Sequence, residues 1–520
     1  MHLPLLLLLW GLGLGPPSRP RLVVVITVDQ LRPDYFDRYR SQLSGGLKVL
    51  LEQGAVFTDA YQDHAVTETA PGHSTVLSGR WPAHTGIISN LTGVQDSTTP
   101  LLEVRGLGAS PVRFTGTGFF DWLKAAEPMA RALSVSRKDR GAILPLGRAR
   151  EQVYWYQSGS FTTSRYYADS LPAWVRAFNA RRIPFRAAGR WWTPLLPERA
   201  YPEPDSVPYE NGGADFAFPH RLPEDSALAA VAFGATPTMD SLTLAFALEG
   251  VRVLQFGSRG ATDLLAVSLS ATDLVGHAYG PDSREIHDQV VRLDRSLGWF
   301  LTQLFVRYGR DNVLVVLTAD HGVTPLPERS RALGHPGARR VLADSIIRSA
   351  NDALDARVGG ADWLSLETGM VLVPERVRLA AQGVSVDSVI ADLAARLREL
   401  PGVARVDRPA DLAGQDTTDA VVRRWVHHIP PGASVELVVT LTPYSVWTAQ
   451  GLPPIAMHGQ PNDFDAHVPI IFYGRGIQRG TYRDRVNTVD IAPTLARLLG
   501  LTPAEPVDGR ALTEALVPEN

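Results

Sequence analysis

Cysteine is absent from all 520 residues, so neither a disulfide bond nor a lipid anchor on an N-terminal cysteine can form. A strong excess of one charge is also missing, because 51 basic and 54 acidic residues leave a formal net charge of −3. Nothing in that balance favours nucleic acid or an acidic membrane surface as a partner. Outside the N-terminus, the chain has no apolar run long enough to span a bilayer. We therefore expect no nucleic-acid partner and no stable membrane insertion.

One apolar run, at the N-terminus, extends from Leu5 to Leu14 and stops at a Gly-Pro-Pro-Ser segment. It is too short to span a bilayer and is typical of the apolar part of a secretory signal peptide. The residues before it contain no Lys or Arg, and a disordered or buried tail is the alternative interpretation. We predict a signal peptide over residues 1–19 and a periplasmic or secreted protein.

Three runs of β-branched and apolar residues, at 21–28, 264–270 and 312–318, are typical of strands buried on both faces of a parallel sheet. A helical apolar repeat over 283–306 lies between the second and third runs. The chain is 45% hydrophobic and 20% charged, a composition that can bury a large core. These features predict an α/β fold with a three-layer core, in which helices flank a large, mostly parallel sheet.

The remaining length is predicted to form inserted cap or lid segments within a core that spans 20–520. Residues 150–255 contain many aromatic residues with little periodicity, which suggests a lid of loops and short helices. Filling of the core by these aromatic side chains is the alternative. Residues 340–450 alternate between helix-like and strand-like pieces, so a second, small α/β insertion is predicted there.

An acidic residue follows each of the three predicted core strands: Asp29, Asp273 and Asp320. Because ligands of open α/β sheets bind at the carboxyl ends of the strands, these side chains are candidates for one shared site. Taken singly, an aspartate at a strand end more often caps a turn or a helix. Three such residues with histidines nearby are difficult to explain in that way.

Three histidines have positions that suit metal binding. His277 lies four residues after Asp273, so one helical turn places both on the same face. His321 is adjacent to Asp320, and His458 lies in a Gly/Pro-rich loop before the last strand. Together with the aspartates, these oxygen and nitrogen ligands fit two Zn²⁺ ions that keep room for a substrate.

Thr69 carries a hydroxyl group suited to attack such a substrate. It precedes Pro71 and Gly72, where a helix can begin. The free N–H groups and the dipole at a helix N-terminus favour a bound anion. A threonine hydroxyl is a poor nucleophile at neutral pH unless a base or a metal removes its proton. The predicted metal ligands would supply that assistance.

The Thr69-Ala-Pro-Gly-His73 segment resembles the Thr-x-Pro-x-His segment of the alkaline phosphatase superfamily. The similar branches are the nucleotide pyrophosphatase/phosphodiesterases and the phosphate-irrepressible alkaline phosphatases of the PafA type. In both, a Gly-Ile-x-x-Asn segment follows, which Gly86-Ile-Ile-Ser-Asn90 resembles. The resemblance covers the core blocks 20–145, 260–325 and 455–512.

The resemblance implies that Thr69 is the nucleophile and forms a phosphothreonine intermediate. It implies that Asn90 donates a hydrogen bond to a nonbridging phosphoryl oxygen, where charge must be stabilised. It also divides the six ligands between two zinc ions and places Thr69 on the second ion. The first zinc would be held by Asp273, His277 and His458, and the second by Asp29, Asp320 and His321.

Lys138 and Arg140 lie in a segment, 136–145, that is similar to the Lys-x-Arg segment of PafA-type monoesterases. The resemblance implies that both cations bind phosphate. A phosphate monoester carries one negative charge more than a diester, and two additional cations match that charge. From composition alone, a solvated loop is the alternative for both side chains.

Other branches of the superfamily fit less well. Sulfatases use Cys or Ser in a C/S-x-P-x-R motif, whereas this chain has His73 where their arginine would stand. The cofactor-independent phosphoglycerate mutases use Ser with a different ligand pattern. His467 is a rival of His458 as a zinc ligand, but the resemblance places the ligand in a His-Gly pair. We therefore expect His467 to lie behind the ligands.

These inferences predict a zinc-dependent hydrolase that acts on small-molecule phosphate monoesters and releases inorganic phosphate. A phosphodiesterase or nucleotide pyrophosphatase on the same two-metal core is the alternative. A hypothesis from a different class is a non-catalytic binding domain that retains the fold. The complete ligand set and the intact nucleophile argue against that hypothesis.

Overall fold

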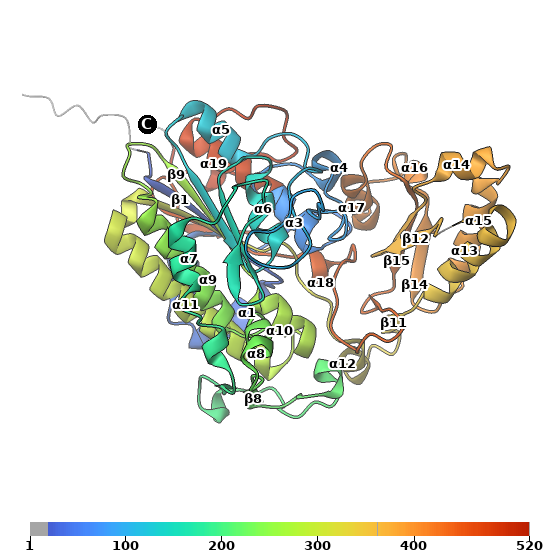
Figure 1. Ribbon diagram of the computed structural model, residues 1–520, viewed down its shortest axis with the longest axis horizontal. Coiled ribbons are helices and arrows are strands. Elements are labelled where there is room, and N and C mark those ends of the chain that lie inside the picture. The colour runs from blue at the N-terminus through green and yellow to red at the C-terminus, as the bar shows by residue number, and fades with distance from the viewer. Residues whose placement is uncertain (1–18, 361, 519–520) are drawn as a thin grey trace, which may run out of the picture.

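The computed structural model describes residues 19–360 and 362–518. The predicted signal peptide lies outside the described residues except for its last position. The described chain forms a large α/β body and a smaller lobe beside it, coloured orange at the right of Figure 1. In this part of the chain, no single helix is long and apolar enough to cross a membrane, although the bent pair α8 (Ser226–Phe233) and α9 (Thr238–Val253) together reaches that length and composition.

A nine-stranded sheet forms the centre of the large body. In order across the sheet, its strands are β18 (Gly480–Tyr482), β2 (Ala55–Phe57), β17 (Ile470–Tyr473), β10 (Val313–Thr318), β1 (Leu22–Val28), β9 (Asp263–Leu269), β4 (Ala132–Ser136), β5 (Gln152–Gln157) and β6 (Ser160–Thr162). Strands β10 to β5 run parallel to one another. Strands β17 and β6 run antiparallel to their partners. The sheet is therefore mostly parallel, as predicted.

Strand β1 lies in the middle of the sheet because its apolar, β-branched side chains can be buried on both faces. Every residue of β1 is buried. Leu22 pairs with Asp263 of β9 and with Val313 of β10, both in parallel register. The three strands predicted from apolar runs are thus confirmed, and they end at the same edge of the sheet.

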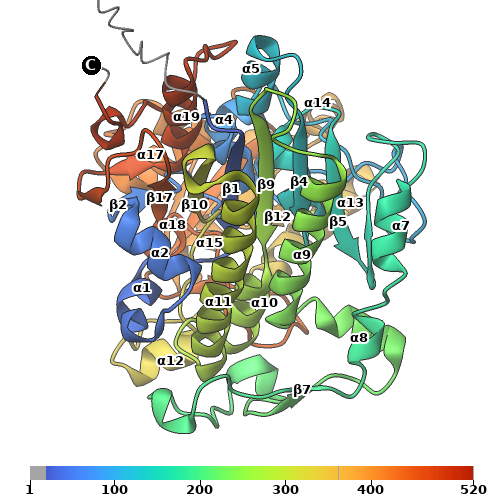
Figure 2. The ribbon, with the colours of Figure 1, turned by 90° about the vertical axis from the view of Figure 1, so that its left-hand side faces the viewer.

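Helices cover both faces of the sheet, which confirms the predicted three-layer α/β fold. The side chains of β1 alternate between two cores: Leu22, Val24 and Ile26 pack on one face, and Val23 and Val25 on the other. The first face is covered by α2 (Gly46–Gln53), α9 and α11 (Arg284–Tyr308), which stand in front of the sheet in Figure 2. The second face is covered by α3 (Thr69–Val76), α5 (Phe119–Ala126), α6 (Asp139–Ile143) and α19 (Ile491–Leu499).

The smaller lobe corresponds to the insertion expected over 340–450, and it has a hydrophobic core of its own. Its sheet is antiparallel and is flanked by α13 (Asp344–Val358) and α15 (Val386–Arg398). In order across the sheet, its strands are β12 (Ser365–Glu367), β13 (Met370–Leu372), β15 (Val435–Leu441) and β14 (Val403–Asp407). The tip of the β12–β13 hairpin faces the large body, where Thr368 contacts Glu68.

The segment expected to form a lid, 150–255, is built differently from that expectation. Strands β5 and β6 extend the central sheet, and α9 packs against one of its faces. Tyr154, Trp155 and Phe246 are buried in the two cores, so these aromatic residues fill the core, as the alternative interpretation states, whereas Trp191 is exposed. The part between α7 (Ala173–Asn179) and α9 consists of loops, short strands and short helices.

Candidate active site

The candidate active site lies at the carboxyl edge of the central sheet. Asp29 directly follows β1, Asp273 lies in the first turn of α10 (Ala271–Tyr279) after β9, and Asp320 follows β10. All three carboxylates are buried. The parallel register of β9, β1 and β10 brings together residues that are far apart in the sequence.

Asp273, His277 and His458 form the first ligand cluster. One ligand atom from each lies within 4.8 Å of the others. His277 Nε2 is 3.2 Å from Asp273 Oδ1, because α10 places residues four apart on one face. His458 Nε2 is 3.5 Å from the same oxygen and 3.2 Å from His277 Nε2. The residues expected to hold the first zinc therefore converge on one point.

Asp29, Asp273 and His321 form the second cluster, again with ligand atoms within 4.8 Å of one another. His321 Nε2 lies 3.4 Å from Asp29 Oδ1. Asp273 thus reaches both clusters, which its sequence position does not indicate. Asp320 stands slightly apart. Its Oδ1 accepts the backbone N–H groups of Gln30 and His321, and its Oδ2 lies 3.7 Å from His321 Nε2.

The three clustered histidines are oriented alike. In each, Nδ1 is hydrogen-bonded to a backbone carbonyl oxygen, which leaves Nε2 facing the cluster. The pairs are His277 with Ala456 at 2.6 Å, His458 with Thr67 at 2.7 Å and His321 with Gly322 at 2.9 Å. Such outer hydrogen bonds are typical of metal-ligating histidines, because they keep the lone pair of Nε2 turned toward the ion.

The polar atoms at the centre of the site fit a divalent cation. Asp29 Oδ1 and His321 Nε2 are buried and have no hydrogen-bond partner. Buried polar atoms are almost always paired, so unpaired atoms that converge are suited to bind a cation. Burial lowers the pKa of His321, but Asp320 and Asp29 outweigh burial and raise that pKa to about 9. The same negative charge would stabilise a bound metal ion.

Thr69 is the first residue of α3 and is buried at the centre of this arrangement. Its Oγ1 accepts a hydrogen bond of 3.1 Å from Lys138 Nζ. The same ammonium group lies 2.5 Å from Asp29 Oδ2 and 2.7 Å from Asp273 Oδ2. Lys138 therefore connects the hydroxyl to both clusters, and it is buried rather than solvated.

Asn90 and Arg140 are partly exposed. Asn90 Oδ1 accepts the backbone N–H of Ala70 at 2.9 Å, which fixes the carboxamide next to the start of α3. Arg140 lies in the short helix α6 rather than in the solvated loop that is the alternative from composition. Its Nη1 is 3.4 Å from Asp139 Oδ1, and its buried Nε has no hydrogen-bond partner.

Three further residues, to which the sequence patterns assign no role, take part in the site. His73 Nδ1 lies 3.1 Å from Asp320 Oδ2. Gln30 Nε2 donates a hydrogen bond of 2.9 Å to Asp273 Oδ1. Arg137 has a buried Nε without a hydrogen-bond partner, and burial lowers its pKa. Gln30 and Arg137 are each adjacent in the sequence to a predicted site residue, and His73 lies in the same motif as Thr69. That proximity is the signal by which the sequence could indicate them.

His467 is not part of the site. It pairs with Tyr61 across an antiparallel bridge, so its ring stacks on the Tyr61 ring with centroids 4.9 Å apart. Its Nε2 is hydrogen-bonded to the carbonyl oxygen of Thr58 at 3.0 Å. The expectation that His467 lies behind the zinc ligands is therefore wrong. His458 is the histidine that reaches the clusters.

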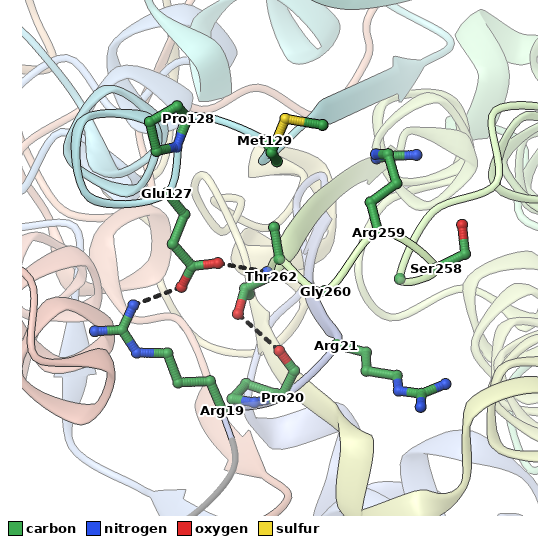
Figure 3. Close-up of a pocket in the computed structure, with 12 residues that line it drawn as sticks. Arg19, Pro20, Arg21, Glu127, Pro128, Met129, Ser258, Arg259, Gly260 and Thr262 are labelled. Carbon is green, nitrogen blue, oxygen red and sulfur yellow. Dashed lines mark hydrogen bonds and ion pairs between the residues drawn. The ribbon is translucent and has the colours of Figure 1, made fainter.

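A cavity of about 510 Å³ lies at the opposite edge of the sheet (Figure 3). Its walls come from residues that precede β1, β4 and β9, including Arg21, Met129 and Gly260. Figure 3 shows Glu127 between Arg19 and the backbone N–H of Thr262, so these contacts join all three segments. None of the predicted site residues lines this cavity. It is therefore separate from the candidate active site.

Comparison with known proteins gives consistent sequence matches over almost the whole chain. The family model described as type I phosphodiesterase / nucleotide pyrophosphatase matches residues 23–406. Alkaline phosphatase PhoK of a Sphingomonas species is 33% identical, with 95% of this chain and 91% of the relative aligned. Alkaline phosphatase PafA of Elizabethkingia meningoseptica is 29% identical, with 96% of this chain and 95% of the relative aligned.

Solved structures agree with the sequence matches. The crystal structure of wild-type alkaline phosphatase PafA superimposes with a TM-score of 0.87 at 29% identity, covering 97% of this chain and 100% of that chain. Murine ectonucleotide pyrophosphatase / phosphodiesterase 5 matches with a TM-score of 0.53 at 14% identity, covering 95% of this chain and 100% of that chain. The second match shows a shared fold and nothing further.

Proposed function

The chain belongs to the type I phosphodiesterase / nucleotide pyrophosphatase family and is an alkaline phosphatase, and we propose that it hydrolyses phosphate monoesters with two Zn²⁺ ions through a covalent Thr69 intermediate. The observation that carries this proposal is the position of the Thr69 hydroxyl. It is buried, it begins a helix, and Lys138 Nζ connects it to carboxylates of both ligand clusters.

The two ligand clusters support binding of metal at two points. The division of the six ligands between two ions follows the resemblance, in which Asp320 rather than Asp273 completes the second set. One ion would be held by Asp273, His277 and His458, and the other by Asp29, Asp320 and His321. When bound, such a pair of ions supplies Lewis acidity and neutralises the charge on the attacking and leaving oxygens. Oxygen and imidazole ligands in these numbers suit Zn²⁺.

Thr69 performs the covalent step in this proposal. Its hydroxyl gives up its proton to solvent, and Oγ1 bonds to phosphorus as the bond to the leaving oxygen breaks. The leaving oxygen takes up a proton from solvent and departs as the alcohol. Water then attacks the phosphothreonine, releases inorganic phosphate and restores the hydroxyl. Lys138 Nζ, 3.1 Å from Oγ1, lies where it can bind the phosphoryl oxygens of the group that Oγ1 attacks. The N-terminus of α3 favours the phosphoryl anion beside it.

Asn90 and the two cations hold the phosphoryl group. Because Asn90 Oδ1 is occupied by the Ala70 N–H, its Nδ2 group is left to donate to a nonbridging oxygen. Lys138 and Arg140 match the second negative charge that a monoester has and a diester lacks. This charge argument favours the monoesterase over the phosphodiesterase.

The test compares kcat/KM for p-nitrophenyl phosphate and bis-p-nitrophenyl phosphate with the Zn²⁺-loaded protein. We expect a clear preference for the monoester. Combining Lys138→Ala with Arg140→Ala should lower monoester hydrolysis by roughly a hundredfold and diester hydrolysis far less, since these cations bind the additional charge. Arg148→Ala, at an exposed position shortly after α6, controls for the loss of a positive charge.

A preference for the diester would contradict the proposal, and so would equal losses in the double variant. Failure to hydrolyse either ester, together with an absence of bound zinc, would instead favour the non-catalytic binding domain. The periplasmic or secreted location and the signal peptide stay predictions; N-terminal sequencing of exported protein would check both.

A further inference from the structure

The tip of the β12–β13 hairpin carries a residue that suits its turn poorly. Thr368 and Gly369 connect the two strands, and both have positive φ values, +43° and +88°. Two-residue hairpin turns of this kind favour Asn-Gly or Gly-Gly, because a β-branched side chain is strained at positive φ. Strain of this kind persists where the surroundings hold the residue, and it often marks a functional position. Thr368 is therefore held there by something other than turn preference.

The Thr368 hydroxyl is hydrogen-bonded to Glu68, the residue that precedes the proposed nucleophile. Thr368 Oγ1 donates a hydrogen bond of 2.6 Å to Glu68 Oε1. The other carboxylate oxygen, Glu68 Oε2, accepts the backbone N–H of Asn90 at 2.7 Å. Asn90 Oδ1 in turn accepts the N–H of Ala70, next to Thr69. One carboxylate thus joins the inserted lobe to Asn90, and Asn90 to the start of α3.

Two other contacts bring the same hairpin tip to the site. Glu367 Oε2 accepts a hydrogen bond of 3.0 Å from the hydroxyl of Ser89, the neighbour of Asn90. The methyl group of Thr368 packs on Gly459, where an added Cβ would lie 2.4 Å from it. Gly459 follows the ligand His458. The hairpin tip therefore contacts both the segment of Asn90 and the loop of a proposed metal ligand.

We propose that Thr368 and Glu68 are positioning residues, through which the inserted lobe sets the place of the Asn90 carboxamide. The inference rests on the role of Asn90 in the proposed function. Hydrogen bonds to a carboxylate are stronger than neutral ones, and both oxygens of Glu68 are occupied by donors. A displacement of about 1 Å in a group that stabilises the transition state is costly to the rate.

The hydroxyl of Thr368 can be tested apart from its role in the turn. Thr368→Val keeps the branched shape and removes the hydroxyl, Thr368→Ser keeps the hydroxyl, and Thr368→Gly removes both the hydroxyl and the strain. We expect Val and Gly to lower monoester kcat/KM about tenfold through kcat, while Ser stays near the wild type. The Tm of the Gly variant should not fall, since glycine accepts a positive φ. Thr418→Val, which removes a hydroxyl-to-carboxylate bond at an exposed site of the same lobe, is the matched control.

A double-mutant cycle with Asn90→Ala decides whether Thr368 acts through Asn90. If it does, Thr368→Val has almost no further effect in the Asn90→Ala background. Additive losses in the cycle would overturn the inference. It would also be overturned if the Val and Gly variants had wild-type kinetics while Asn90→Ala lost activity. Wild-type kinetics of Asn90→Ala itself would instead count against the proposed function. If the Tm of the Gly variant fell to the assay temperature, unfolding would account for its loss of activity. That result would assign Thr368 to the fold alone.

Discussion

At the scale of the residue, the proposed chemistry depends on one hydroxyl. Thr69 is buried, and its Oγ1 contacts Lys138 Nζ at 3.1 Å. We predict that Thr69→Ala lowers monoester turnover at least about a thousandfold, because the covalent step is lost. Zinc content should stay near the wild-type value, since the six carboxylate and imidazole ligands remain. Elemental analysis and steady-state kinetics on the same preparation would measure both quantities.

Thr69→Ser is the matched control for this substitution, because it retains a hydroxyl at the start of α3. It should keep a substantial part of the activity. Turnover by the Ala variant close to that of the Ser variant would remove the covalent intermediate from the mechanism. Loss of zinc from the Ala variant would show that the hydroxyl is needed to hold an ion.

At the scale of the element, α3 reaches the site through a close approach to the end of β10. A Cβ atom on Gly72 would lie 2.1 Å from the backbone oxygen of Asp320. We predict that Gly72→Ala moves α3, destabilises the fold by roughly 1–3 kcal/mol and lowers kcat/KM at least tenfold. Urea unfolding and monoester kinetics would measure the two effects.

Gly414→Ala is the control for Gly72→Ala, because nothing lies within 4 Å of the added Cβ at Gly414. That variant should match the wild type in both measurements. If Gly72→Ala also left stability and kinetics unchanged, the packing of α3 on the end of β10 would not determine the position of Thr69.

At the scale of the whole molecule, the ligand clusters join segments that are distant along the chain. Asp29 and His458 lie far apart in the sequence. Each belongs to one of the two clusters, and Asp273 is common to both clusters. Ions that bind the native state alone stabilise it, by about 4 kcal/mol at a thousandfold excess over Kd. We predict that chelation with EDTA lowers the Tm by several degrees and that added Zn²⁺ restores it, measured by differential scanning calorimetry.

Thr69→Ala provides the control for chelation, because it retains the ligands and lacks activity. Its Tm should fall and recover with the metal as the wild-type Tm does. An unchanged Tm after complete removal of zinc would mean that an ion bound to the clustered carboxylates and imidazoles does not stabilise the native state.

Much of the fold and part of the site could be predicted because the signals are local. The β-branched run of β1 indicates burial on both faces, and the four-residue spacing of Asp273 and His277 places them on one face of a helix. The aromatic residues of β5 do not indicate by themselves where this strand lies. Tyr154 and Trp155 lack a clear period, and their place at the edge of the parallel strands depends on pairing with β4. Local patterns do not specify such pairing.

By itself, the sequence determined which side chains could bind ions and which hydroxyl could attack, because strand ends, helical spacing and short motifs are properties of neighbouring residues. Only the tertiary structure decided that Asp273 reaches both clusters, that His467 turns away, and that Thr368 reaches Glu68. These contacts join segments hundreds of residues apart. Their geometry follows from strand register and from the packing of the inserted lobe, which no local pattern encodes.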